Sequence, residues 1–174
     1  MFSAPSSPRR PLRRVALTGI LIALEIVLSR FLSINAWNIK IGFSFVPVVL
    51  AAMLLGPWAS AAVAALGDLL GALLFPIGPY FPGFTLTALL TGLTFGLLLH
   101  QKQTWPRILL AVGSTQLVLS LVLNTVWIAL LYGKAFGVLL AGRLVQCAVL
   151  LVVQTAGTAA LAKAVPALRK KEWL

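Results

Sequence analysis

The chain is 174 residues long; 60% of its residues are apolar and only 10% are charged. A soluble domain of this composition would expose too much apolar surface to water, so the composition excludes that class and selects an integral membrane protein. The net charge of +11 comes from basic residues gathered at the two ends and in one loop, which is typical of membrane topology signals rather than of nucleic-acid binding.

Six apolar segments are predicted to cross the membrane, since about 20 helical residues span a hydrocarbon core of roughly 30 Å. Helices are expected because they satisfy their own backbone polar groups, and the long Leu/Ala/Val runs lack the alternation of a barrel. In chain order, the predicted spans are residues 15–32, 41–55, 59–75, 84–99, 106–131 and 136–164. They define an all-α integral membrane protein, a bundle of six transmembrane helices over residues 15–165, with basic tails at 1–14 and 166–174.

Prolines and glycines predict where the helices stop. Residues 76–83 contain three prolines and two glycines, which precludes a regular helix between the third and fourth spans. Pro106 suits the first turn of the fifth helix, and the sixth helix is predicted to end before Pro166.

The basic residues predict the orientation of the bundle. With both termini in the cytoplasm, ten of the 14 basic residues lie on the cytoplasmic side, as the positive-inside rule requires. These ten are Arg9, Arg10, Arg13, Arg14, Lys102, Arg107, Lys163, Arg169, Lys170 and Lys171.

The other four basic residues, Arg30, Lys40, Lys134 and Arg143, fall at the outer end of the membrane. An ionisable group within a span costs at least about 2.5–3.5 kcal/mol, so it normally faces protein or a watery cavity. The two carboxylates within the spans can neutralise at most two of these cations, so the surplus predicts an anionic ligand, whose carboxylate an arginine can hold with two hydrogen bonds. Snorkelling to lipid headgroups is the alternative for the lysines and for Arg30.

Aromatic and amide side chains accompany these cations. Aromatic rings in the outer segments can enclose a flat heterocycle, although an interfacial aromatic belt would use the same residues. Asn124 and Trp127 share a face of the fifth helix at i,i+3, and Arg143 and Gln146 do so on the sixth, which predicts that the two pairs line one cavity. The candidate ligand-binding residues are Arg30, Trp37, Lys40, Phe43, Phe45, Tyr80, Phe81, Phe84, Asn124, Trp127, Lys134, Arg143 and Gln146.

The sequence offers no catalytic or metal-binding set. No Gly-x-x-x-x-Gly-Lys-Ser/Thr loop is present to bind ATP phosphates, and one histidine and one cysteine do not give the spacing of a metal site. We therefore expect no enzymatic activity, no cofactor and no metal. Asp68 either relays protons in a secondary carrier, together with Glu25, or hydrogen-bonds a neighbouring helix.

Small residues form a stripe on the first helix. Ala16, Gly19 and Ala23 are three or four residues apart, so they share one face and allow close approach of another helix. That helix belongs either to the same bundle or to another subunit.

Three sequence segments resemble a known family. Residues 30–34 (RFLSI), 37–47 (WNIKIGFSFVP) and 75–85 (FPIGPYFPGFT) are similar to the substrate-binding subunits of energy-coupling factor (ECF) vitamin transporters, especially the folate-specific members. The resemblance extends from about residue 17 to residue 161 and implies a six-helix bundle with both ends cytoplasmic.

The resemblance also implies a function. Folate would bind at the outer face beneath the loops joining helices one to two and three to four, with Arg30 in contact with the ligand. The stripe Ala16, Gly19 and Ala23 would dock a membrane coupling subunit (EcfT), energised by two cytoplasmic ATPases (EcfA and its paralogue) in a bacterial cell membrane. A binding subunit for another vitamin, and a proton-coupled carrier using Asp68 and Glu25, remain the alternatives.

Overall fold

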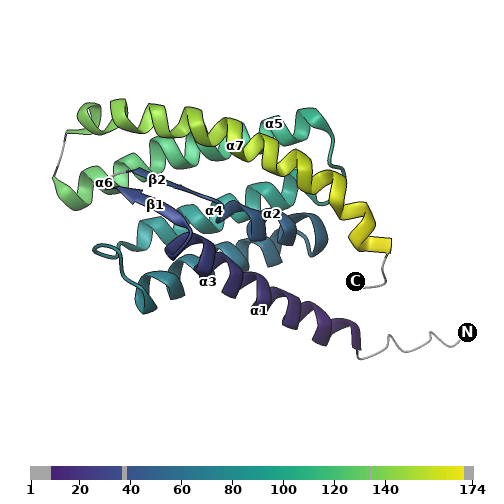
Figure 1. Cartoon of the computed structure of the whole chain (residues 1–174). Helices are drawn as coiled ribbons and strands as arrows, with labels where there is room; N and C mark the ends of the chain where they lie inside the picture. Colours follow the sequence, from purple (N-terminus) through teal and green to yellow (C-terminus); the bar gives the residue numbers. More distant parts are fainter. Residues whose placement is uncertain (1–8, 37–38, 134, 171–174) are drawn as a thin grey trace, which may run out of the picture.

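The computed structural model describes residues 9–36, 39–133 and 135–170, and it is almost entirely helical there (Figure 1). Because α5, η1 and α6 follow one another without a break, these residues form six helical rods and one β-hairpin. The elements are α1 (Arg9–Arg30), β1 (Ser33–Ala36), β2 (Ile39–Gly42), α2 (Phe45–Leu54), α3 (Pro57–Leu74), α4 (Pro82–Leu99), α5 (Trp105–Gly113), η1 (Ser114–Leu123), α6 (Asn124–Tyr132) and α7 (Phe136–Lys170).

Four helical stretches within the described residues are long and apolar enough to cross a membrane. The first rod, α1, has basic residues at both ends and Glu25 between them, and α2 has only ten residues, so neither reaches that standard. The four stretches are Pro57–Leu74, Pro82–Leu99, Trp105–Tyr132 and Phe136–Pro166. Apolar helices therefore dominate the bundle, as the predicted all-α membrane class requires.

The prediction that the second span begins at Ile41 is wrong, because β1 and β2 pair as antiparallel strands and α2 begins only at Phe45. Ser33 pairs with Gly42 at the open end of the hairpin, and a Cβ at Gly42 would lie only 2.5 Å from Ser33 Cβ. The glycine thus permits the close approach of the two strands. Gly42 also lines the cavity of the bundle.

Two other helix ends also differ from the prediction. The sixth helix was expected to end before Pro166, but α7 continues through this proline to Lys170. Proline removes one backbone hydrogen bond without preventing the next turn, and in a long helix the remaining bonds hold that turn. Likewise α1 begins at Arg9, so part of the segment predicted as an N-terminal tail is helical.

The fifth rod changes its winding in the middle. A π-helical segment, η1, runs between α5 and α6, and it contributes Thr115, Gln116 and Ser120 to the interior of the bundle. π-Helical turns are rare and occur often at functional sites. The rod ends at Gly133, whose left-handed conformation (φ +61°) suits a residue without a Cβ.

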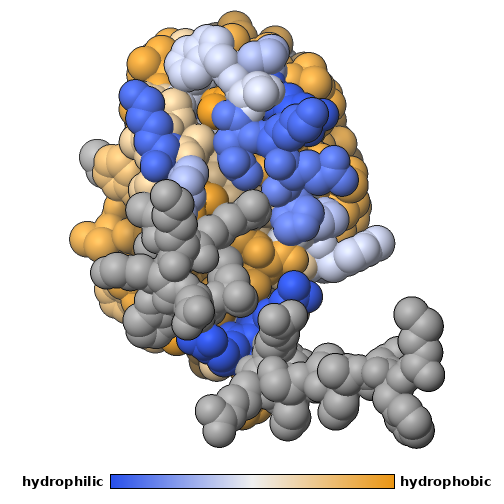
Figure 2. Space-filling view, turned by 90° about the vertical axis from the view of Figure 1, so that its right-hand side faces the viewer, coloured by the Kyte–Doolittle hydropathy of each residue, from blue (hydrophilic) through white to orange (hydrophobic). Residues whose placement is uncertain are grey.

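Dense apolar packing is concentrated in the half of the bundle that contains the first turns of α1 and the last turns of α7. Fully buried side chains there include Met53 near the end of α2, Leu99 at the end of α4 and Ile108 near the start of α5. The first turns of α1 and the last turns of α7 lie at the same end of the molecule, as the predicted topology requires (Figure 1). Viewed from that end, hydrophilic side chains gather on the surface (Figure 2).

Candidate ligand-binding site

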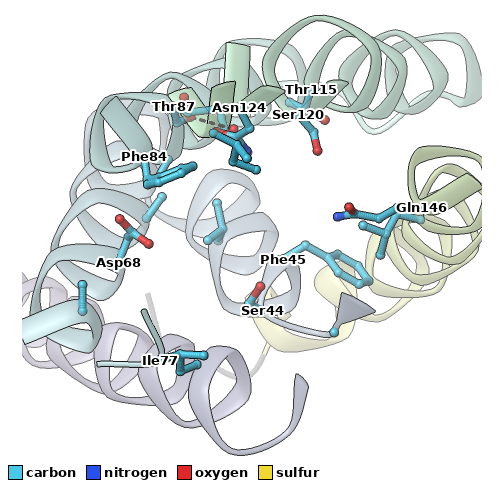
Figure 3. A pocket seen from close by; sticks show the side chains of 18 of the residues that line it. Ser44, Phe45, Asp68, Ile77, Phe84, Thr87, Thr115, Ser120, Asn124 and Gln146 are labelled. Carbon is cyan, nitrogen blue, oxygen red and sulfur yellow. Dashed lines mark hydrogen bonds between the residues drawn. The ribbon is translucent and has the colours of Figure 1, made fainter. Parts of the chain in front are cut away.

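A cavity of about 590 Å³ occupies the other half of the bundle, next to the hairpin. All six rods contribute to its walls, and the loop between α3 and α4 adds the partly exposed residues Ile77 and Tyr80 at its rim. Side chains from several helices converge on this space (Figure 3). The fully buried ring of Phe95 also lines it, from the side of the apolar core.

The wall formed by α1 and α3 carries charged residues. The Nη2 of Arg30 donates a hydrogen bond to the Asp68 carbonyl oxygen at 3.2 Å and lies 3.7 Å from Asp68 Oδ1. A Cβ at Gly71 would lie 2.8 Å from Arg30 Nε, so this glycine leaves the space that the guanidinium occupies. Glu25, five residues earlier on α1, is buried on the same wall.

Hydrogen bonds link this wall to the loop between α3 and α4. Thr85 Oγ1 donates to Asp68 Oδ2 at 2.9 Å, and the Tyr80 hydroxyl lies 3.0 Å from Thr85 Oγ1. Since Thr85 donates its hydrogen to Asp68, Tyr80 donates to Thr85. Asp68 therefore ties α1, α3 and α4 together, which is the second of the two roles that the sequence left open for it.

The opposite wall, from η1, α6 and α7, is lined by amides, hydroxyls and Arg143. The guanidinium of Arg143 is buried and donates to the Ser120 carbonyl oxygen at 2.9 Å. Gln146 lies one turn further along α7, and Ser120 and Asn124 are one turn apart on the fifth rod (Figure 3). Of the two pairs predicted to line one cavity, Arg143 and Gln146 both do so, and Asn124 does so without its partner Trp127.

Several buried polar atoms on these walls have no hydrogen-bond partner in the described part of the chain. They include Arg30 Nε, Gln116 Oε1, Asn124 Oδ1 and Gln154 Oε1. A buried polar group without a partner costs about 1–3 kcal/mol, so native proteins rarely leave such groups unmatched. Their gathering around one cavity indicates a site built for a polar ligand.

Aromatic rings form two layers on the α4 side of the cavity. Phe84 lines the cavity, and Phe81 stands behind it with ring centroids 6.3 Å apart. Phe81 packs in turn on Trp127, whose Nε1 donates to Thr87 Oγ1 at 3.0 Å. Across the cavity, Phe45 is buried and also lines it. The inner layer thus offers apolar faces to a ligand, and the outer layer supports it.

The predicted site residues divide into three groups. Seven of them line the cavity: Arg30, Phe45, Tyr80, Phe84, Asn124, Arg143 and Gln146. Three described residues do not line it: Phe81 and Trp127 stand behind the wall, and Phe43 is exposed. Trp37, Lys134 and the Lys40 side chain lie outside what the structure describes. The part that any of these residues plays in binding stays a prediction.

Other lining residues were not predicted as ligand contacts. Gln154 follows Gln146 by two helical turns, and Gln116 precedes Asn124 by the same interval. Extending the two predicted polar faces deeper into the membrane would have found both glutamines. Glu25 gave no comparable signal, because its place on the wall depends on long-range packing against α3.

The predicted excess of positive charge is not seen on the described walls. Two basic residues, Arg30 and Arg143, line the cavity together with two acidic residues, Glu25 and Asp68. The prediction let the two carboxylates neutralise at most two of the four cations. The side chains of the other two cations, Lys40 and Lys134, lie outside what the structure describes, so the surplus itself stays a prediction. Unmatched polar atoms and the shape of the cavity, rather than its net charge, therefore indicate a ligand site.

The small-residue stripe on α1 faces outward. Ala16, Gly19 and Ala23 are all exposed, and a Cβ at Gly19 would meet no atom within 4 Å. Packing of this stripe within the bundle, one of its two interpretations, is therefore wrong. Its use by another subunit stays a prediction.

Comparisons with known proteins agree with the fold. Residues 13–162 match the family model described as ECF transporter, substrate-specific component. The chain is 44% identical over 133 residues to the folate transporter FolT of Clostridium novyi, covering 76% of this chain and 77% of that protein. It is 35% identical over 130 residues to the folate transporter FolT of Leuconostoc mesenteroides, covering 74% and 70%. Among solved structures, FolT bound with folic acid has a TM-score of 0.82 and 34% identity, covering 87% of this chain and 93% of that one.

The fold and the cavity define a membrane-embedded protein that encloses a small-molecule site between its helices. No group of three or more potential metal ligands occurs among its described residues. The chain belongs to the family of substrate-specific components of ECF transporters, which are substrate-binding subunits rather than enzymes.

Proposed function

We propose that this chain captures folate at the outer face of a bacterial cell membrane and delivers it inward as the binding subunit of an ECF importer. The observation that carries the proposal is the cavity of about 590 Å³, which combines aromatic faces, two arginines and the buried amide oxygens of Gln116, Asn124 and Gln154, which have no hydrogen-bond partner among the described residues. Its volume lies within the range of about 300–1,000 Å³ typical of small-molecule sites. The likeness to the two folate transporters supports the choice of vitamin.

Folate matches the chemistry of the walls. Its pterin is a flat heterocycle with N–H donors, which suit the phenylalanine faces and the unpartnered amide oxygens. Its glutamate tail carries two carboxylates, which suit guanidinium donors such as the unpartnered Nε of Arg30. The proposed contacts are Arg30, Phe45, Tyr80, Phe84, Asn124, Arg143 and Gln146.

Import also requires partners in this proposal. The chain has no ATP-binding loop of the Gly-x-x-x-x-Gly-Lys-Ser/Thr type, so we assign the energy to a coupling subunit, EcfT, and two cytoplasmic ATPases. The exposed stripe of Ala16, Gly19 and Ala23 is the proposed contact with EcfT, since small residues allow helices to approach closely in lipid. Hydrolysis in the partners would tip the binding subunit in the membrane.

Calorimetry on the purified chain in detergent tests the ligand. We expect folic acid to bind with a sub-micromolar dissociation constant, and thiamine, biotin and riboflavin to give no comparable heat. Tight binding of one of these vitamins in place of folate would overturn the ligand assignment.

A transport assay tests the need for partners. In proteoliposomes, folate uptake should require the energising subunits and ATP. Uptake by the chain alone, driven by a pH gradient, would overturn the proposal in favour of a carrier.

A further inference from the structure

One buried carboxyl group in the cavity has no role in the proposed function so far. Glu25 and Asp68 are the acidic residues that line the cavity in the described part of the chain. Both carboxylate oxygens of Asp68 are engaged, Oδ1 by the Arg30 guanidinium and Oδ2 by the Thr85 hydroxyl. Glu25 is 7% exposed and precedes Arg30 by five residues, so it lies roughly 7–8 Å deeper along the helix axis.

The Glu25 carboxyl group lies against the backbone of α3. A Cβ at Gly67 would overlap the Glu25 carboxyl, with Cδ at 2.7 Å and Oε2 closer still. Gly71, one turn further along α3, leaves the corresponding space for Arg30. The two glycines thus leave room for two side chains of α1, of opposite charge, to lie against α3.

The deeper part of the cavity is rich in hydrogen-bond acceptors. Besides Glu25, it contains the Oε1 atoms of Gln116 and Gln154, which have no hydrogen-bond partner within the described ranges. Acceptors favour the donor-bearing edge of a ligand and disfavour its carboxylates. The arginine at the end of α1 lies nearer the rim and favours the opposite chemistry.

We infer that Glu25 recognises the edge of the pterin formed by its 2-amino group and the neighbouring ring N3–H, with the glutamate tail of folate towards the rim. This inference rests on the proposed function. The pterin edge presents two parallel N–H donors, and a carboxylate offers two oxygens with matching spacing, so the pair forms a bidentate, charge-assisted hydrogen bond. Such bonds inside a low-dielectric cavity set specificity, because a ligand without the two N–H donors cannot form the bidentate pair with the carboxylate.

A thermodynamic cycle in protein and ligand tests the inference. Calorimetry would measure the affinity of the parent chain and of Glu25→Gln for two ligands. These are folic acid and an analogue with a methyl group in place of the 2-amino group. We expect the parent to bind the analogue about tenfold to a hundredfold more weakly than folic acid. The affinity of Glu25→Gln for folic acid should be lower than that of the parent by a similar factor. Its affinities for the two ligands should differ by less than about threefold.

Asp68→Asn is the matched control, since it removes the other carboxylate of the same cavity. Asp68 acts through Arg30 and Thr85, so this variant should lose affinity for both ligands by the same factor. Its preference for folic acid over the analogue should therefore equal that of the parent. Equal binding of the two ligands by the parent would overturn the inference, whether or not any variant folds. If Glu25→Gln lost affinity for both ligands by the same factor, the inference would also be overturned. Failure of the parent to bind folic acid at all would instead refute the proposed function on which the inference rests.

Discussion

The contact between α3 and α4 allows a sharp test of the packing, at Gly92. A Cβ at this position would lie 2.7 Å from the carbonyl carbon of Ser60 and 2.8 Å from Cα of Ala61. Ordinary contacts of a Cβ begin at 3.4 Å, and backbone atoms cannot swing aside as a flexible side chain does. Gly92→Ala must therefore push the two helices apart locally.

The size of the effect follows from two opposing terms. Overpacking of a tight interior contact costs about 1–3 kcal/mol, and a gap of about 0.5–1 Å forfeits a quarter to a half of the dispersion energy of the atoms involved. Alanine in a helix is favoured over glycine by about 0.5–1 kcal/mol, which offsets part of this cost. We expect Gly92→Ala to be less stable than the parent by about 1–2 kcal/mol.

Thermal unfolding in detergent, followed by helical circular dichroism, measures the difference. Gly113→Ala is the matched control, because this glycine is also helical and a Cβ there would meet no atom within 4 Å. The control should unfold at the same temperature as the parent or higher, and Gly92→Ala below both. Equal melting temperatures for the two variants would refute the claim that backbone contact at Gly92 limits the approach of α3 and α4.

Three further predictions concern binding and coupling. Gly71→Ala places a Cβ 2.8 Å from Arg30 Nε, and the flexible guanidinium will move. We expect the folate affinity measured by calorimetry to fall about tenfold, with little change in melting temperature. Unchanged affinity would contradict a ligand contact for Arg30. Asn124→Leu removes a buried amide oxygen that has no partner in the described residues. The ligand-free variant should melt no lower than the parent, and it should bind folate about tenfold more weakly. A lower melting temperature would indicate a structural role instead. Ala23→Leu adds bulk to the exposed stripe; folate binding should be unchanged while uptake in proteoliposomes with the energising subunits falls, and full uptake would exclude the stripe from docking.

Helical periodicity was sufficient to predict part of the cavity. Asn124 and the pair Arg143 and Gln146 were placed on inward faces because polar side chains in a membrane span avoid lipid, and the structure brings all three to one cavity. The same argument holds for any helix whose register is continuous. It depends only on local geometry, which the sequence specifies.

Features that depend on contacts between distant residues were not predicted. The pairing of Arg30 with Asp68 and the position of Glu25 against Gly67 arise from the packing of α1 on α3, and spacing within one helix does not reveal it. The hairpin was missed for a related reason. Each strand has only four residues, too few to show a period, and the pairing of Ser33 with Gly42 is itself a tertiary contact.

Dense packing and the cavity lie in opposite halves of the bundle, with Met53 and Leu99 in one and the polar walls around Asn124 in the other. Thermal stability and ligand preference are therefore governed by largely separate sets of positions. A protein engineer who wishes to change the vitamin can exchange cavity side chains while the interlocked apolar half keeps the scaffold intact. The same separation would let related scaffolds diverge in the molecule they capture before they diverge in how they fold.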